Sequence, residues 1–413
     1  TPSKQVENFW HGNIPWISSS DLTESSVWKI NITRHITEEA VAKSATHICP
    51  RNTVLVVSRV GVGKVAIAPV EVCTSQDFTN LVSKRNDARF LAYCIQAKMK
   101  IMAEKTQGTS IKGVTVESIA QMEIELPSQE EQTAIAEVLS DVDNLISSLQ
   151  QLIEKKKAIK QGAMQELLTG KKRLPGFDEE WRTYKLGELG SFDKGCGISR
   201  AESNTGNFPA VRYGELYTKH TDYVKQYYSC ISGDVAQTAK RVTFGDILFA
   251  ASGETKEEIG VCAAIVDRRD IFAGGDIVVF TPTTEINPIF FGTLLNMPFV
   301  QKQKSERGQG DAVVHIHADS LSEIIISMPE KNEQEAIATV IKDFNDEIEQ
   351  LERKLAKYQQ IKQGMMQELL TGRIRLVDAD DKEQLKTQIF QEKQSQPAHN
   401  QHFDDAVMIA GIV

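Results

Sequence analysis

The chain has 413 residues, of which 25% are charged, and its 47 basic and 56 acidic side chains give a net charge of −9. This length allows two or three domains, and the composition is that of an ordinary folded protein rather than a disordered or membrane-spanning one. No apolar run approaches the roughly 20 residues that a membrane helix needs. Six scattered cysteines without a CxxC pair favour free thiols in a reducing cytoplasm over disulfides or a zinc site.

The negative charge is concentrated outside the predicted domains. Residues 175–180 contribute −3 and residues 377–413 contribute −4, so the rest of the chain is close to neutral. A nucleic-acid surface would therefore be a local basic patch. Net charge neither supports nor excludes DNA binding.

Residues 1–127 predict a first domain that is mixed or mainly β. Thr53–Ser58 and Val65–Val70 are rich in β-branched residues and are punctuated by glycine, which is typical of strands. Asp87–Met102 has apolar residues at helical spacing and predicts a helix. We expect a further strand at Met122–Leu126, leading into the next segment.

Residues 128–174 and 328–376 predict two long spacer helices that are copies of each other. The stretch starting at Leu126 recurs from Met328 without a gap, and about half of the positions are identical. Apolar residues alternate spacings of three and four, the heptad pattern of a coiled-coil seam. The seam consists of Ile135, Leu139, Val142, Ile146, Leu149 and Ile153 in the first copy, and Ile337, Ile341, Phe344, Ile348, Leu351 and Leu355 in the second.

The ends of these helices also carry recognisable signals. Ser128 with Glu131 predicts a capping box, and Gly170 and Gly372 suit the position just after a helix. About 40 residues at ~1.5 Å each make a rod of roughly 60 Å. Its apolar stripe must be buried, and the matching seams favour each helix as the partner of the other. The alternative is an ordinary helical core.

Residues 175–327 predict a second domain related to the first. Phe208–Leu216 matches Ile14–Leu22, and Asp246–Ser252 matches Thr53–Arg59 at nearly the same offset. By this offset the counterpart of Trp181 would precede Thr1. We therefore expect the first domain to lack its opening strand and the chain to be cut from a longer one. Residues 377–413 predict a polar, disordered tail that ends abruptly in an apolar run.

This arrangement resembles the specificity subunit of type I restriction–modification systems. The resemblance covers residues 1–376 and is carried by IKQGAMQELLTG at 159–170, IKQGMMQELLTG at 361–372, the LP or MP followed by EQ before each helix, IPWISSSDL and SRVGVGK. It implies an α/β (α+β) fold, with two mainly β target-recognition domains joined by two long antiparallel helices that form a coiled-coil spacer. The start and the tail beyond Leu376 depart from the family pattern.

The resemblance also implies the function and the partners. Each domain would read one half of a split double-stranded DNA site, and the helices would serve as a ruler and as a docking surface for two methyltransferase subunits. Restriction/translocase subunits would complete the enzyme. The chain itself would be a non-catalytic, cytoplasmic DNA-recognition subunit without a bound cofactor or metal, and S-adenosylmethionine, ATP and magnesium would act on the partner subunits.

The loops provide chemistry suited to DNA. Glycine amides can approach phosphates closely, arginine can bond guanine, and glutamine can bond adenine bidentately. The duplicated loops around Gln107 and Gln309 carry the strongest signal, whereas Ser58–Lys64 fits an ordinary β-turn nearly as well. The predicted DNA-binding residues are Arg59, Gly61, Gly63, Lys64, Lys105, Gln107, Gly108, Thr109, Lys112, Arg212, Tyr213, Ser252, Lys256, Arg307, Gln309 and Gly310.

Catalytic interpretations of four motifs are rejected. Asn287–Phe290 lacks the second proline of an adenine methyltransferase motif and predicts a helix entry. Asp246 with Glu254 and Lys256 predicts a charged loop rather than a nuclease centre. Gly61–Lys64 lacks the spacing and the Ser/Thr of a P-loop. His315 and His317 have no further zinc ligand nearby, which favours a solvated or core role.

Two other functions remain open. One is the recognition part of an autonomous methyltransferase–nuclease whose catalytic domain lies outside this sequence. The other is a coiled-coil scaffold that binds no nucleic acid, for which DNA binding would be absent or independent of salt.

Overall fold

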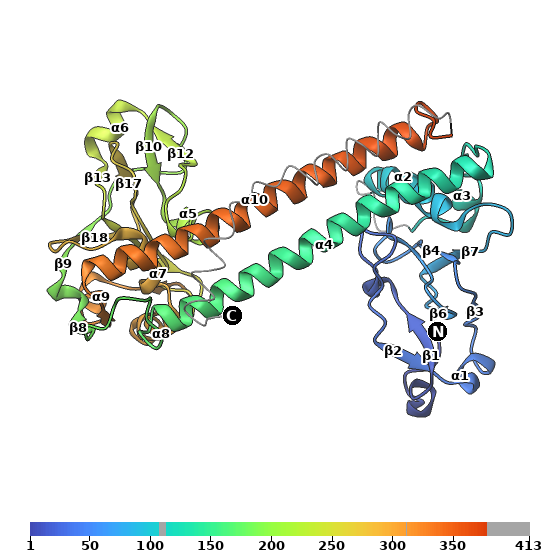
Figure 1. Cartoon of the computed structure of the whole chain (residues 1–413), viewed down its shortest axis with the longest axis horizontal. Helices are drawn as coiled ribbons and strands as arrows, with labels where there is room; N and C mark the ends of the chain where they lie inside the picture. The colour runs from blue at the N-terminus through green and yellow to red at the C-terminus, as the bar shows by residue number, and fades with distance from the viewer. Residues whose placement is uncertain (107–112, 311, 378–413) are drawn as a thin grey trace. The chain divides into compact units, whose positions relative to one another are not determined.

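The computed structural model describes residues 1–106, 113–310 and 312–377. The chain divides into two compact units (Figure 1). Unit 1 combines Thr1–Gln151 with the described part of Glu352–Pro397, and unit 2 contains Leu152–Leu351. Each unit consists of one domain and a part of both long helices. No helix in the described ranges is long and apolar enough to cross a membrane.

The domain of unit 1 is built from two small sheets. The first has the order β2-β1-β6-β3, with β1 parallel to β6, and the second has the order β5-β4-β7. The strands are β1 (Ile14–Ile17), β2 (Arg34–Ile36), β3 (Ile48–Cys49), β4 (Val54–Val57), β5 (Val65–Ile67), β6 (Val72–Thr74) and β7 (Phe78–Leu81). The helices are η1 (Glu7–Trp10), η2 (Ser19–Asp21), α1 (Glu38–Ala42), α2 (Ala88–Thr106) and α3 (Val116–Ala120).

Strand β4 shows why this sequence folds as a central strand. All four of its residues are buried, because alternate side chains point to opposite faces and both faces are covered. Val54 and Val56 pack with Phe90 and other residues of α2, while Leu55 and Val57 pack in a separate cluster with Ile17. The predicted strands at 53–58 and 65–70 and the predicted helix at 87–102 are confirmed.

The domain of unit 2 contains the same plan with additional strands. Its sheets have the orders β12-β10-β17-β13, β11-β16-β14-β18-β9, β15-β19 and β20-β8. The strands are β8 (Arg182–Lys185), β9 (Gly190–Lys194), β10 (Phe208–Val211), β11 (Asp222–Tyr223), β12 (Ser229–Ile231), β13 (Lys240–Val242), β14 (Ile247–Ala250), β15 (Ser252–Gly253), β16 (Cys262–Ala264), β17 (Ile271–Ala273), β18 (Ile277–Pro282), β19 (Val314–His315) and β20 (Ile325–Met328). The helices are η3 (Leu186–Glu188), α5 (Tyr213–Thr218), α6 (Gly233–Thr238), α7 (Pro288–Leu295), α8 (Pro298–Arg307) and α9 (Ala318–Ser322).

The repeat predicted from the sequence is present in the sheets. The parallel pair β1–β6 corresponds to β10–β17, and β5-β4-β7 corresponds to β16-β14-β18. The prediction of a strand at Met122–Leu126 was wrong. Its counterpart β20 forms because it pairs with β8, whereas residues 122–126 pair with no strand in the described part of unit 1.

The two long helices are α4 (Gln129–Leu167) and α10 (Lys331–Leu369), each of 39 residues. The six seam residues of α4 are all buried, as are Ile337, Ile341, Phe344 and Ile348 of α10. Gly170 and Gly372 follow the helices at φ of +70° and +68°, the left-handed conformation that glycine adopts without strain. These features of the prediction are confirmed.

The predicted capping box is only half present. The Ser128 hydroxyl accepts a hydrogen bond from the Glu131 amide at 3.3 Å. The Glu131 carboxylate is buried and instead accepts from the amides of Leu376 and Val377, both at 2.8 Å. Its repeat counterpart, Glu333, likewise binds the segment that follows the opposite helix, because its carboxylate accepts from the Arg173 side chain after α4. These two glutamates anchor the chain after the opposite helix.

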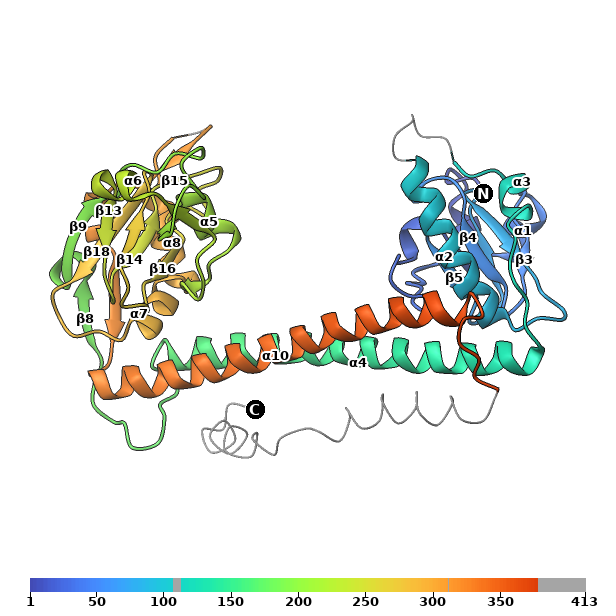
Figure 2. The same ribbon diagram turned by 90° about the horizontal axis from the view of Figure 1, so that it is seen from above.

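The two helices are antiparallel neighbours within each unit (Figure 2). In unit 1, Asp143 of α4 pairs with Lys362 of α10. In unit 2, Lys156 of α4 pairs with Glu347 of α10 at 2.8 Å. The predicted α/β (α+β) class with an antiparallel helical spacer is therefore confirmed.

Candidate nucleic-acid interface

In unit 1 the segment Ser58–Lys64, which contains predicted DNA contacts and which we call the hairpin loop, adjoins Ser18–Asp21, which we call the cap turn, and also Val114. We call the residues between α2 and Val114 the post-helix loop, of which 107–112 lie outside the described residues. The hairpin loop joins β4 to β5, the two strands at the middle and edge of a sheet. It contains Gly61 at φ +83° and Gly63 at φ +107°, so both glycines adopt a conformation that other residues rarely take.

Described residues on both sides of 107–112 lie close to the hairpin loop. In α2, the Ala103 Cβ would be 3.5 Å from a Cβ on Gly63. After 112, the Val114 amide donates to the Ser58 carbonyl at 2.8 Å. Gly113 is packed so closely that a Cβ would lie 2.5 Å from the Ser58 carbonyl oxygen. The fold therefore holds Gly113 and Val114 against the hairpin loop.

The cap turn adjoins the same hairpin loop. The Ser18 amide donates to the Asp21 carboxylate at 2.7 Å, which shapes the turn. The Lys64 ammonium group donates to the Ser19 carbonyl at 3.0 Å and is half-buried. Lys64 thus ties the hairpin loop to the cap turn, while the Arg59 side chain is exposed.

The same three segments meet in unit 2. Here the hairpin loop is Ser252–Gly260, the post-helix loop is Gly308–Val313 and the cap turn is Arg212–Glu215. β15 pairs with β19, and the Ile316 amide donates to the Ala251 carbonyl at 2.9 Å, the repeat counterpart of the bond from Val114. The Tyr217 hydroxyl donates to the Ser252 carbonyl at 2.9 Å, which holds α5, the helix that begins within the cap turn, against the hairpin loop.

Buried polar groups hold this arrangement in unit 2. The Lys304 ammonium is fully buried and donates to the Gly260 carbonyl at 2.7 Å, and burial lowers its pKa to about 8. Burial raises the pKa of Tyr217 to about 12. Gly310 lies at φ +108°, and a Cβ there would lie 2.2 Å from the Val313 carbonyl oxygen. Only glycine fits this position.

The predicted contact residues fall into three groups. Arg59, Lys256 and Gln309 are exposed, and Tyr213 is 40% exposed. Lys64, Ser252 and Arg307 have partners within the fold: Ser252 bonds the Nδ1 atom of His315 at 3.0 Å, and Arg307 donates to the carbonyls of Gln303 and Glu323. Gln107, Gly108, Thr109 and Lys112 lie outside the described residues, and Lys105 lies in the last turn of α2.

Sequence reasoning missed the residues that join the segments. Tyr217 and Lys304 were not singled out, and His315 was assigned only a solvated or core role. Their function depends on contacts between segments distant in the chain, such as the 44 positions that separate Lys304 from Gly260. No spacing in the sequence marks these contacts.

The motifs rejected as catalytic have structural roles. Asn287 caps α7, because its side chain accepts from the amides of Ile289 and Phe290. Asp87, at the equivalent place before α2, accepts from the amides of Arg89 and Phe90. Asp246 was expected in a charged loop, but it is 4% exposed and accepts from the Thr243 amide at 2.7 Å in the turn before β14.

Comparisons with known proteins agree on one family. A family model described as the type I restriction modification DNA specificity domain matches residues 1–159 and 178–363. The type I restriction enzyme MjaIX specificity subunit of Methanocaldococcus jannaschii is 35% identical over 152 residues, which cover 36% of this chain and 35% of that protein. The MjaVIII specificity subunit of the same organism is 26% identical over 315 residues, covering 71% and 72%.

A solved structure has the same fold. The S subunit of a type I restriction–modification system from M. genitalium superposes with a TM-score of 0.56 at 16% identity, covering 90% of this chain and 91% of that one. At this identity the likeness concerns the fold.

Proposed function

Because the chain belongs to the family of type I restriction–modification DNA specificity domains, we propose that it chooses the DNA sequence on which a methylating enzyme acts. Each domain reads one half of a split site in the major groove. The hairpin loop, post-helix loop and cap turn of each unit form the reading surface. The two helices, which run through both units, form the spacer between the readers.

The observation that carries this proposal is a backbone contact that recurs in the described residues of both units and lies beside different exposed side chains. The hydrogen bond from Val114 to Ser58 in unit 1 recurs from Ile316 to Ala251 in unit 2, so the frame is the same. The exposed residues on that frame differ, with Arg59 in unit 1 and Lys256 in the hairpin loop of unit 2. The same backbone arrangement with different exposed side chains is suited to reading two different half-sites.

The chemistry of the exposed groups supports base recognition. Arginine can bond the O6 and N7 atoms of guanine, and glutamine can bond the N6 and N7 atoms of adenine; a good bidentate pair contributes about 1–3 kcal/mol of discrimination. Gln309 is presented by a rigid backbone, because its amide and carbonyl both bond His315. A fixed backbone lowers the entropy cost of placing the side chain in the groove.

The spacer supports a ruler function. Each helix has 39 residues, which is roughly 60 Å at ~1.5 Å per residue. Two readers on one face of the duplex need a separation of about one helical turn, ~34 Å. Helices of this length leave room for partner subunits to dock between the readers.

The chain acts without catalytic chemistry of its own in this proposal. The described residues contain no group of three or more His, Cys, Asp or Glu residues that could hold a metal ion. We assign S-adenosylmethionine to methyltransferase subunits, two per chain by the repeat, and ATP with magnesium to restriction/translocase subunits. We assign the protein to the cytoplasm, together with the DNA it would read. Because the relatives reported above are specificity subunits, this proposal is favoured over part of an autonomous methyltransferase–nuclease.

The test is methylome sequencing of a host that carries the modification subunit gene, with and without this chain. We expect one split motif to be methylated only when the chain is present. Methylation of the same motif without the chain, or of all sequences equally, would refute the proposal. The variant Gly310→Ala serves as an internal comparison, because it should weaken only the half read by unit 2.

A further inference from the structure

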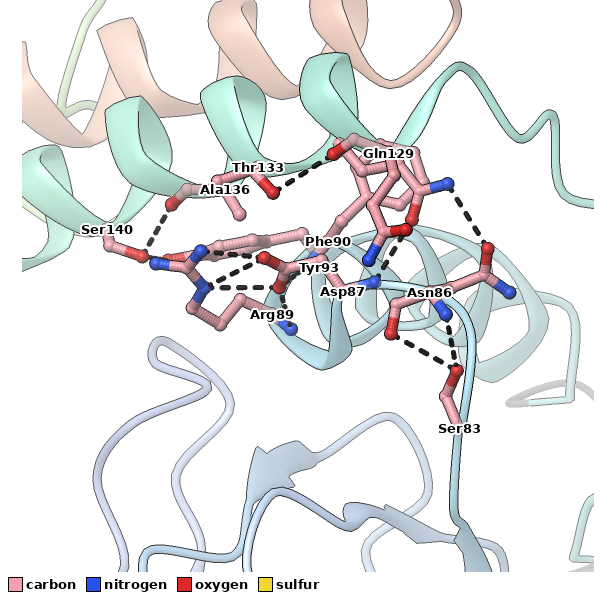
Figure 3. Close-up of polar contacts among 11 residues, drawn as sticks. Ser83, Asn86, Asp87, Arg89, Phe90, Tyr93, Gln129, Thr133, Ala136 and Ser140 are labelled. Atoms are coloured by element: carbon pink, nitrogen blue, oxygen red, sulfur yellow. Dashed lines mark hydrogen bonds and ion pairs between the residues drawn. The ribbon is translucent and has the colours of Figure 1, made fainter.

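A buried polar cluster joins the domain of unit 1 to both helices. The carboxylate of Asp143 on α4 pairs with the ammonium of Lys362 on α10 at 2.6 Å, and the two side chains are 4% and 9% exposed. The Tyr93 hydroxyl of α2 donates to the same carboxylate at 2.8 Å. Figure 3 shows Tyr93 between α2 and α4 on the side of Ser140, whose hydroxyl is 3.5 Å away.

The same cluster includes the segment that follows the cap turn. The Trp28 indole N–H donates to the Tyr93 hydroxyl at 3.0 Å, and Lys362 also donates to the Ser25 carbonyl at 3.3 Å. One ion pair therefore bonds α4, α10, α2 and the loop at 25–28.

Unit 2 has a cluster at the equivalent place with a different distribution of charge. Lys160 of α4 donates to the side-chain oxygen of Asn345 on α10 at 2.7 Å, and Asn345 donates to the Tyr223 hydroxyl at 3.2 Å. Next to Tyr223, the buried Asp222 accepts from Asn296 at 3.2 Å and interacts electrostatically with Lys160. Lys225 and Lys304 also act on Asp222.

The repeat relates the two clusters residue by residue. Asp143 corresponds to Asn345, and Lys362 corresponds to Lys160, at the offset of 202 that relates the helices. The helix carboxylate of unit 1 is thus an amide in unit 2, where a carboxylate from the domain, Asp222, interacts electrostatically with the lysine. Each of the two helix lysines is thus associated with one carboxylate, although the carboxylate comes from a different element.

We propose that these two clusters are mounts that fix the angle at which each recognition domain stands on the helix pair, and so set the gap between half-sites that the protein accepts. The link to the gap rests on the function proposed above. Apolar packing is non-directional and tolerates small slides, whereas a charged group withdrawn from water is satisfied in one geometry and destabilises the fold when its partner is removed. Asp143, Lys362, Lys160 and Asp222 are therefore positioning residues, not DNA contacts.

The sharpest test exchanges the position of one charge in unit 2. Asp222→Asn removes the carboxylate and keeps the shape, and asparagine tolerates the φ of +62° at this position as aspartate does. Adding Asn345→Asp then recreates the arrangement of unit 1, with the carboxylate on α10. Asp234→Asn, an exposed aspartate of α6 in the same domain, is the matched control.

Two measurements follow on the full chain. The first is the rate of hydrogen exchange at the Val224 amide, which directly follows β11 and donates to the Ala264 carbonyl. This rate reports, in the absence of DNA, how firmly the cluster holds the domain. The second is methylation, by the complex with the modification subunit, of DNA in which the half-sites are one base pair closer or farther apart. It reports which half-site spacings the protein accepts. We expect Asp222→Asn to speed exchange on the order of tenfold or more. We also expect the Asp222→Asn variant to direct methylation of DNA with the altered gaps while the half-site bases stay the same. The double variant, Asp222→Asn with Asn345→Asp, should reverse both effects.

Each of the other outcomes contradicts one part of the proposal. Native exchange in Asp222→Asn would overturn the mount, and the same holds if Asp234→Asn has an equal effect. Faster exchange with an unchanged gap would overturn the link to half-site spacing. A double variant that stays as loose as Asp222→Asn would overturn the role of charge. If the unaltered chain directs no methylation, the proposed function fails, and the exchange arm still decides whether the cluster holds the domain.

Discussion

Replacing Lys362 with methionine should destabilise unit 1 far more than an ordinary lysine substitution. Methionine fills a similar volume but has no charge, so that Asp143 keeps its buried carboxylate without the ammonium at 2.6 Å. The Tyr93 hydroxyl at 2.8 Å remains its bonded partner. Removing one member of a buried ion pair costs about 3–5 kcal/mol, because the other charge is left uncompensated.

The double variant Asp143→Asn with Lys362→Met separates charge from packing. Asparagine can still accept from Tyr93, and its repeat counterpart Asn345 already occupies the equivalent place in unit 2. We therefore expect the double variant to recover most of the loss, to within about 1–2 kcal/mol of the original chain. Lys100→Met, at an exposed position of α2, should change stability by less than about 0.5 kcal/mol.

Urea unfolding followed by tryptophan fluorescence measures this effect. Three of the four tryptophans lie in unit 1, and Trp28 bonds Tyr93 within the cluster. With a slope of ~2 kcal/mol per M, a loss of 3–5 kcal/mol lowers the midpoint by about 1.5–2.5 M urea. A midpoint for Lys362→Met equal to that of Lys100→Met would refute the reasoning, as would a double variant that is less stable than the single one.

Three further predictions concern the loops, the spacer and the chemistry. Gly310→Ala should weaken recognition of the half-site read by unit 2, because a Cβ would lie 2.2 Å from the Val313 carbonyl oxygen, whereas Gly233→Ala, whose Cβ would make only an ordinary contact 3.7 Å from a ring carbon of Phe208, should have no effect in the same methylation assay. Inserting four residues before Thr169, about one turn or ~6 Å, should lengthen the gap by one or two base pairs with the same bases. An unchanged gap at full activity would show that spacing is set elsewhere. The isolated chain should transfer no methyl group to DNA and cut no DNA, and either activity in the absence of partner subunits would contradict the assignment.

The main architecture was predictable because it rests on periodic and repeated patterns. The heptad seam predicts both helices, since apolar positions such as Ile135 and Ile337 must be buried along one stripe. The offset matches predict which strands correspond, because β4 and β14 occupy the same place in their sheets. Local signals were sufficient at Gly170 and Gly372, where the backbone conformation depends on one residue.

Features that depend on a distant partner were not predictable. Glu131 has the spacing of a capping box, yet its carboxylate binds the amides of Leu376 and Val377, more than 240 positions away. The segment at 122–126 has strand-like residues but no strand beside it in the described part of unit 1, and a strand forms only when its backbone groups are paired. The ion pair of Asp143 with Lys362 likewise joins residues that no local pattern connects.

Methylome sequencing of two single-loop variants tests the central claim most directly. Arg59→Ala in unit 1 and Gln309→Ala in unit 2 would each be expressed with the modification subunit, with Arg51→Ala as an exposed arginine outside the three segments. Losing one bidentate contact costs about 1–3 kcal/mol of discrimination. We predict that each variant relaxes one half of the split motif and leaves the other half and the gap unchanged, while Arg51→Ala keeps the full motif. Relaxation of both halves by either variant, or no change in either half, would contradict the assignment of one half-site to each domain.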